Sequence, residues 1–306
     1  MHPASSVIFF TVFSGAGFGL LILMGLATTS NATPTTAFLV VHFGLAFAMA
    51  VGGLISSTYH LGHPERAWRA LSQWRSSWLS REGVFAILTL MVAGLYAFLW
   101  IFSNNPIGPL GWISSILGLL TVYATGMIYA QIKAVQIWSR WLTPVCYLLF
   151  SLAGGALLFI MLHAVFFGTA GSFLSSVAMI SMLVAWVAKL FWWFWAGRMV
   201  PMSTPGSATG LGAIGETRLF ESPHTGSNYL MKEMGHKIAR KHATKLRWIA
   251  LLLGGVLPIA LILLALPAPF DAFWLILAVI SHLVGMLVER WLFFAEAKHT
   301  VMNFYQ

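Results

Sequence analysis

The sequence predicts an all-α integral membrane protein with a bundle of eight transmembrane helices. Its composition is 59% hydrophobic and only 8% charged, and its mean hydropathy is +0.84. No water-soluble core of this size needs so large an apolar share. The apolar residues form runs of about 20, which is the length that crosses a bilayer, and Lys and Arg gather on alternate loops between these runs. We therefore predict a single membrane domain over residues 1–306.

Polar and helix-breaking residues flank each apolar run and set the boundaries of the spans. Gly62 and Pro64 end the second span just after His60, and Asp271 is suited to cap the eighth. Glycines inside the first, second, fifth and seventh runs predict close approach of neighbouring helices. Tryptophans near the ends of the runs are typical of the interfacial belt of a bilayer protein. The predicted spans lie near residues 5–27, 36–58, 83–103, 110–130, 143–166, 172–195, 247–266 and 271–294.

Positive charge is confined to one set of loops, and this predicts the orientation of the bundle. All Lys and Arg residues except Lys189 lie on 59–82, 131–142, 196–247 or near the C-terminus, and the alternate loops hold none. By the positive-inside rule, both termini and every long loop are cytoplasmic. The net charge of +9 faces anionic lipid or an acidic partner and does not indicate nucleic acid. Lys189, inside the sixth span, is expected to extend to the cytoplasmic interface.

The long cytoplasmic loop 196–246 changes character along its length. It begins with a helix-breaking stretch at 201–210 and becomes basic from Lys232 to Arg247. Two interpretations fit this segment: a surface helix on anionic lipid, or a docking platform for a soluble subunit. The single cysteine, Cys146, excludes internal disulfides and cysteine-ligated iron–sulfur clusters within this chain. An iron–sulfur electron relay would therefore belong to another subunit.

Two acidic residues lie at the cytoplasmic boundary of a predicted span, where a carboxylate in hydrocarbon is costly. Glu82 begins the third span, and Glu289 lies in the last turns of the eighth. A structural interpretation makes Glu82 a first-turn carboxylate that the helix dipole favours, and it pairs Glu289 with Arg290 or Lys298. The functional interpretation makes Glu82 a group that transfers protons.

A histidine lies opposite this carboxyl group in the predicted topology. His60 ends the second span and Glu82 opens the third, so antiparallel packing puts both at a similar depth. Imidazole and carboxyl groups near the bilayer surface hydrogen-bond quinone carbonyl oxygens and exchange protons with water. We predict a quinone site at His60 and Glu82, with Arg66 and Arg81 tuning or orienting the carboxyl group. Second-tier candidates are His63, Glu289 and Arg290.

Two further histidines lie toward the other end of the bundle. His42 in the second span and His163 in the fifth are on antiparallel helices. We favour the interpretation that both are buried histidines bonded to neighbours, with no metal held by this chain. The alternative is a b-type haem, because imidazoles facing each other across a bundle are its axial ligands. His282, in the middle of the eighth span, is a third candidate ligand.

The run His60-Leu-Gly-His-Pro-Glu-Arg-Ala, followed by Leu79-Ser-Arg-Glu-Gly, resembles the membrane anchor subunit of dimethyl sulfoxide reductase-type molybdenum enzymes. The N-terminal Met1-His-Pro-Ala-Ser-Ser and the C-terminal Glu289-Arg-Trp-Leu are most similar to the branch that serves cytoplasmic sulfite dehydrogenases. The resemblance spans the whole chain and implies a location in the bacterial inner membrane. It implies a molybdopterin catalytic subunit, an iron–sulfur relay subunit and this quinone-handling anchor, with both metal cofactors in the partners. It also implies that His60, Gly62 and Arg66 form the quinol-site box, with Glu82 as the acid opposite it.

The expected function is reduction of a quinone, ubiquinone or menaquinone, with electrons from sulfite oxidised on the partner subunit. In reductase members of the family, the catalytic subunits dock on the outer face of the membrane, so the quinol-site box faces outward. The charge bias here instead puts the box and the docked partners on the cytoplasmic side. The runner-up is quinol oxidation for a sulfoxide or polysulfide-type reductase. The alternative of another class is a transporter or proton channel, but the sequence has no paired broken helices at mid-membrane.

Overall fold

The computed structural model describes residues 4–27, 34–59, 61–221, 226, 231, 241–266 and 271–304, and the regular structure within these ranges is helical throughout. Eight helices in this part of the chain are long and apolar enough to cross a membrane. The predicted all-α class with eight membrane helices is therefore confirmed.

The spans follow the chain in order, and the first and the seventh each contain a π-helical turn. The first consists of α1 (Ser5–Phe9), η1 (Phe10–Ser14) and α2 (Gly15–Leu26). The next five are α3 (Thr36–Thr58), α4 (Trp78–Ser103), α5 (Gly108–Ala130), α6 (Leu142–Phe167) and α7 (Ser172–Ala196). The last two are α11 (Ala243–Leu251) with η5 (Leu252–Val256) and α12 (Leu257–Ala265), and α13 (Asp271–Ala295). Short helices outside the spans are η3 (Pro64–Gln73), α8 (Pro205–Thr209), η4 (Leu211–Ala213) and η6 (Thr300–Phe304).

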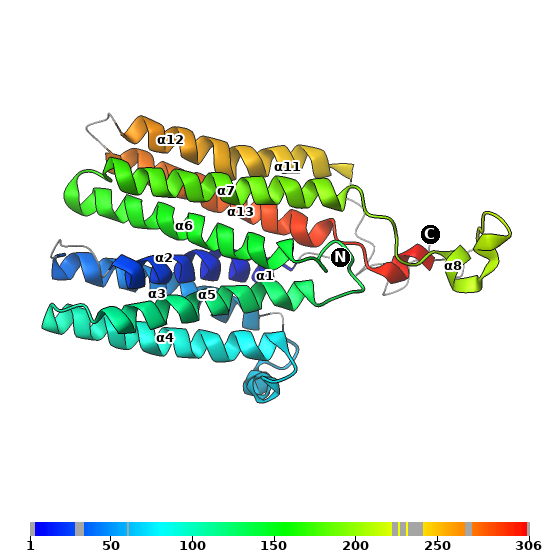
Figure 1. Ribbon diagram of the computed structural model, residues 1–306, viewed down its shortest axis with the longest axis horizontal. Helices are drawn as coiled ribbons and strands as arrows, with labels where there is room; N and C mark the ends of the chain where they lie inside the picture. The colour runs from blue at the N-terminus through cyan, green and yellow to red at the C-terminus, as the bar shows by residue number, and fades with distance from the viewer. Residues whose placement is uncertain are drawn as a thin grey trace.

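The helices lie side by side along one long axis, with α2 and α6 at the centre (Figure 1). α2 packs against α3, α5 and α6, and α6 also packs against α7 and α13. α4 covers α5 on one side, and α11 and α12 cover α13 on the other. The spans that contain α2 and α6 are the most buried of the eight. Side chains on these two helices therefore face the interior that α5 and α13 complete.

The third span begins earlier than predicted, and this changes the position of Glu82. The sequence predicts a start near residue 83, but α4 begins at Trp78. The helical hydrogen bonds start at Ser77, whose carbonyl accepts from the Arg81 backbone N–H at 3.1 Å. Glu82 therefore lies in the second turn of the helix, inside the bundle.

Close packing of α2 against α6 depends on glycines that face each other. A Cβ atom on Gly155 would overlap the carbonyl carbon of Gly19, and one on Gly19 would overlap the carbonyl oxygen of Ser151. The two backbones therefore touch, as small residues permit in membrane bundles.

We expect Gly155→Ala to destabilise the protein by about 1–3 kcal/mol or more, because backbone atoms on both sides cannot move apart without separating the central helices. The thermal unfolding midpoint of the purified protein in detergent measures this effect. Gly44→Ala is the matched control, since a Cβ on Gly44 meets nothing within 4 Å. Equal shifts for both variants would contradict the role of the glycine contact.

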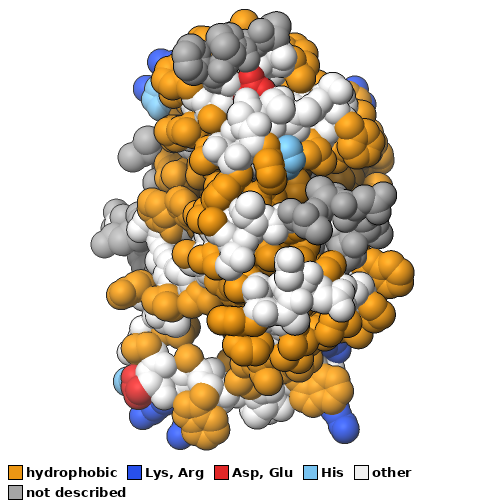
Figure 2. Space-filling view, turned by 90° about the vertical axis from the view of Figure 1, so that its left-hand side faces the viewer, with side chains coloured by type: hydrophobic (Ala, Val, Ile, Leu, Met, Phe, Trp, Pro, Cys, Tyr) orange, Lys and Arg blue, Asp and Glu red, His pale blue; other side chains and the backbone are white. Residues whose placement is uncertain are grey.

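Charge is segregated between the two ends of the bundle. The beginning of α1 and the end of η6 lie at one end (Figure 1). Figure 2 looks onto the opposite end, where hydrophobic and uncharged side chains form most of the surface, an acidic side chain shows near the top, and Lys and Arg appear only at the margins. The end that carries the termini and basic loops is predicted to face the cytoplasm, and this orientation stays a prediction. Residues 232–240 of the predicted basic segment lie outside the described residues.

Candidate functional site: a buried carboxyl group and a charged cavity

Glu82 points from α4 into the bundle and is only 4% exposed. Its hydrogen-bond partner is Thr125 of α5, whose hydroxyl donates to Oε1 of the carboxyl group. Within the described residues, no cation forms an ion pair with Glu82. The interpretation of Glu82 as a first-turn carboxylate is wrong, because the first turn of α4 holds no acidic residue. A buried charge without a partner is costly, so the position suits a group that carries a proton.

The predicted box before α4 lies on an exposed connection. Gly62, His63 and Arg66 are all exposed. The side chains of His63 and Arg66 both contact Glu65, with His63 Nδ1 at 3.0 Å and Arg66 Nε at 3.7 Å from Glu65 Oε1. His60, the centre of the predicted site, lies outside the described residues. Its place beside Glu82 stays a prediction.

Arg81 ties this connection to α4. Its guanidinium donates to the carbonyl oxygens of Trp74 at 3.0 Å and Arg75 at 2.6 Å, and it lies over the ring of Trp78. The structure therefore gives Arg81 a role in fixing the loop, and it records no ion pair from Arg66 or Arg81 to Glu82.

A cluster of three charged side chains is buried between α7 and α13. Lys189 Nζ lies 2.5 Å from Glu289 Oε1, and Arg290 Nε donates to Glu289 Oε2. The three side chains are 1%, 0% and 3% exposed. The expectation that Lys189 extends to the interface is wrong, because the buried carboxylate of Glu289 holds it inside. The predicted pairing of Glu289 with Arg290 is confirmed.

Aromatic rings surround the cations of this cluster, which contains two positive groups for one carboxylate. Lys189 Nζ lies 3.9 Å from the ring centre of Trp192, and the Arg290 guanidinium carbon lies 4.3 Å from that of Tyr147. Phe293 contacts both cations at 5.5 and 5.2 Å. Ring faces attract cations in a desolvated setting and so stabilise the surplus positive charge.

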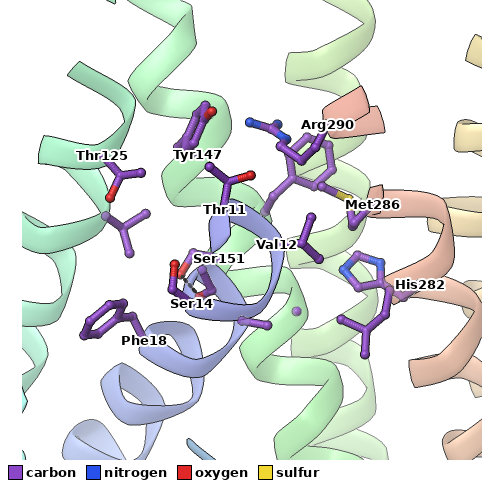
Figure 3. Close-up of a pocket in the computed structure, with 16 residues that line it drawn as sticks. Thr11, Val12, Ser14, Phe18, Thr125, Tyr147, Ser151, His282, Met286 and Arg290 are labelled. Atoms are coloured by element: carbon purple, nitrogen blue, oxygen red, sulfur yellow. Dashed lines mark hydrogen bonds between the residues drawn. The ribbon is translucent and has the colours of Figure 1, made fainter. Parts of the chain in front are cut away.

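A small cavity lined by both polar and apolar side chains lies between Thr125, the partner of Glu82, and Arg290, the partner of Glu289 (Figure 3). In Figure 3 the guanidinium of Arg290 points toward Tyr147, and Thr125 lies at the left of the view, on the other side of Tyr147. The volume of about 30 Å³ has room for one or two waters and is too small for a quinone ring. Other polar residues that line it are Thr11, Ser14, Ser151 and His282.

One π-helical turn lines this cavity, and the other bonds a residue that lines it. η1 supplies Thr11 and Ser14. In η5, the Gly254 carbonyl oxygen accepts from His282 Nδ1 at 2.7 Å and from Trp186 Nε1 at 3.0 Å. A π turn changes the backbone hydrogen bonding, and such turns are frequent at functional sites. Nδ1 of His282 must carry the proton in this arrangement, because a carbonyl oxygen only accepts.

The two histidines considered as haem ligands have partners within the protein. His42 is fully buried and its Nδ1 donates to the Phe38 carbonyl at 2.8 Å, while His163 Nδ1 donates to the Thr169 carbonyl at 2.8 Å. The Phe38 ring contacts both imidazoles, at 3.7 and 6.3 Å between ring centres. The described residues contain no group of three or more metal-ligating side chains. His42 Nε2 is buried and has no hydrogen-bond partner within the described residues, and the b-type haem stays an untested alternative.

A larger, apolar pocket lies at the opposite end of the helices from Glu82. Its volume is about 660 Å³, within the range of small-molecule sites. Among the described residues that line it, His163 is the one ionisable side chain, with Phe38, Trp100 and Phe159 among the apolar ones. This pocket is large enough for a quinone ring. It is therefore an alternative to the quinone site predicted at His60 and Glu82.

Sequence reasoning missed Thr125, Tyr147 and the burial of Lys189. One signal was available for Lys189, which shares a helical face with Met182, Ala185 and Trp193, all of them buried. The partners of these residues were not visible, since Lys189 and Glu289, or Glu82 and Thr125, lie on helices far apart in sequence.

The fold and the site define a multi-pass helical membrane protein whose interior holds a buried carboxyl group and a separate ion cluster. The protein belongs to the family described as DMSO reductase anchor subunit (DmsC), whose model matches residues 1–295. This confirms the resemblance seen in the sequence.

The C subunit of sulfite dehydrogenase from Allochromatium vinosum is 32% identical over 327 positions, covering 100% of this sequence and 99% of that protein. The C subunit of anaerobic dimethyl sulfoxide reductase is 29% identical in Haemophilus influenzae and 30% identical in Escherichia coli, and each match covers 49% of this sequence and 54% of the relative. No solved structure shows a significant match to this protein.

Proposed function

We propose that this protein is the membrane anchor and quinone-reducing subunit of a molybdopterin and iron–sulfur oxidoreductase, with sulfite as the electron donor. The full-length similarity to a sulfite dehydrogenase subunit supports the donor. The observation that carries the quinone proposal is Glu82, a buried carboxyl group near one end of α4 whose partner is a neutral hydroxyl. The partner subunit would supply two electrons and the cytoplasm two protons for each quinone reduced to quinol.

Glu82 would supply one of these protons. The O–H bond of its carboxyl group breaks as an O–H bond to the quinone oxygen forms, and a positioned acid of this kind lowers the barrier to proton transfer. The quinone ring would approach from the side of residues 60–63, because the cavity behind Thr125 is too small for it. His60 would hydrogen-bond the ring from that side.

Two other functions have less support than quinone reduction. Quinol oxidation for a sulfoxide-type reductase is supported by the half-length similarity to the dimethyl sulfoxide reductase subunits. A transporter or channel is supported less, because both spans with π turns stay helical through the interruption, whereas transport sites use unwound helices.

Charge reversal in the basic loop tests the partnership with soluble subunits. We expect Lys237→Glu, Arg240→Glu and Lys241→Glu together to release the iron–sulfur and molybdopterin subunits from membranes, because exposed charge pairs would hold them. Attachment of the unaltered complex should also weaken with salt, which screens such pairs over about 8–10 Å. The amount of each partner in the membrane fraction measures both effects.

The matched control exchanges Lys and Arg at the same three positions and so retains the charge. If the partners stay attached in the reversed variant, lipid contact is the better explanation of this loop. If the iron–sulfur and molybdopterin subunits do not sediment with membranes that contain the unaltered anchor, the proposed complex itself is wrong.

A further inference from the structure

The feature that most needs an explanation is a buried guanidinium group at the wall of the small cavity, because one of its N–H groups lacks a hydrogen-bond acceptor in the described part of the chain. Arg290 is 3% exposed, and its Nε donates to Glu289. The Arg290 and Tyr147 side chains lie close enough to interact, but neither Arg290 Nη1 nor the Tyr147 hydroxyl makes a well-formed hydrogen bond within the described residues. A buried guanidinium N–H without an acceptor is costly. Both groups line the cavity, which has room for one or two waters.

On the opposite wall, Thr125 has one hydroxyl proton and two acceptors within reach. One is Oε1 of Glu82, and the other is the Thr121 carbonyl oxygen at 3.1 Å. A hydroxyl donates once and keeps two lone pairs for incoming donors. Thr125 therefore satisfies only one of these acceptors at a time, and the protonation state of Glu82 determines which.

We propose that the cavity binds water between Arg290 and Thr125, and that Thr125 is a two-state switch that lets Arg290 stabilise the carboxylate of Glu82. When Glu82 is a neutral acid, its O–H donates to the Thr125 oxygen, and Thr125 donates to the Thr121 carbonyl. When Glu82 has given up its proton, Arg290 Nη1 donates to water, water donates to Thr125, and Thr125 donates to the carboxylate.

All donors in the second arrangement point toward Glu82, so each bond polarises the next and strengthens it. The two buried cations, Lys189 and Arg290, are then balanced by two carboxylates, Glu289 and Glu82. Arg290 and Thr125 are positioning residues in this arrangement, and neither touches the quinone. The inference deepens the proposed function and rests on it, since Glu82 is the proton donor in both.

Thr125→Val and Thr125→Ser form the matched pair that tests the switch. Valine keeps the shape of threonine and removes the hydroxyl, whereas serine keeps the hydroxyl. We expect quinone-coupled turnover of the complex to fall about tenfold in Thr125→Val, the rate equivalent of one hydrogen bond to a charged group, and to stay near normal in Thr125→Ser. Thr89→Val is a second control, because Thr89 bonds the Thr121 hydroxyl at 2.9 Å and not Glu82.

The solvent deuterium isotope effect separates this role from structural damage. Proton release from Glu82 should become slower in Thr125→Val, so its isotope effect should exceed that of Thr125→Ser. Equal turnover and equal isotope effects in the two variants would overturn the switch. If Glu82→Gln itself leaves turnover unchanged, the proposed function fails first; if only Thr125→Val is normal, this inference fails alone.

The water is tested directly by a structure of the purified complex at a resolution that shows ordered solvent. Density within hydrogen-bond distance of Arg290 Nη1 and on the path to Thr125 is expected. A dry cavity, with Arg290 Nη1 bonded to protein, would overturn the bridge whatever the kinetics show.

Discussion

Glu82→Gln is expected to lower quinone-coupled turnover by about 10²–10⁴-fold, the usual contribution of a positioned acid or base. Glutamine keeps the shape and one acceptor for Thr125, but it has no proton to transfer. Thr125 is neutral, so the substitution removes no ion pair described in the structure. The measurement is sulfite-dependent reduction of a quinone analogue by the complex in membranes. His60→Ala should in addition weaken binding of the analogue.

The control is reduction of a soluble artificial acceptor, which takes electrons before they reach the anchor. We expect that rate to stay near normal in both variants. Loss of both activities together would mean that the substitutions damage assembly. Normal quinone turnover in both variants would move the quinone away from Glu82, and the apolar pocket at His163 would be the next position to test.

Glu289→Gln is expected to be the most destabilising conservative change in the bundle, at about 3–5 kcal/mol, because it leaves two buried cations without their shared carboxylate. Lys189 and Arg290 both contact Glu289 in the structure, and all three side chains are buried. Removal of the carboxylate charge leaves the two positive groups close together in a setting of low dielectric. Unfolding of the purified protein in detergent and its amount in membranes measure the loss.

Lys189→Met is the comparison, since it leaves Glu289 paired with Arg290 and puts an apolar side chain among Trp192 and Phe293. The large cost of breaking a buried ion pair comes from a charge left without a partner, and Lys189→Met leaves neither Glu289 nor Arg290 in that state. We therefore expect a much smaller loss than for Glu289→Gln. A larger loss for Lys189→Met would mean that Arg290 alone does not compensate Glu289.

Much of the fold was readable along the sequence because membrane spans are local features. A run of apolar residues identifies a helix whatever its neighbours are, since backbone groups in lipid must bond within the segment. The first and seventh spans show where this reasoning stops. Both were predicted as plain helices, but each contains a π turn, and at η5 the Ser281 and His282 side chains of α13 bond the carbonyls of Leu253 and Gly254, a contact that the sequence does not show.

Sequence by itself determined the class of the protein, the number of its spans, the family resemblance and the attention given to Glu82 and Glu289, because few acidic residues lie in or beside hydrocarbon. Only the tertiary structure decided which way those residues point. Hydropathy places a residue at a depth, but the rotation of each helix and its neighbours across the bundle decide whether a charge reaches water or meets a partner. Lys189 meets Glu289 and stays inside, Glu82 meets Thr125, and one small cavity lies between Thr125 and Arg290.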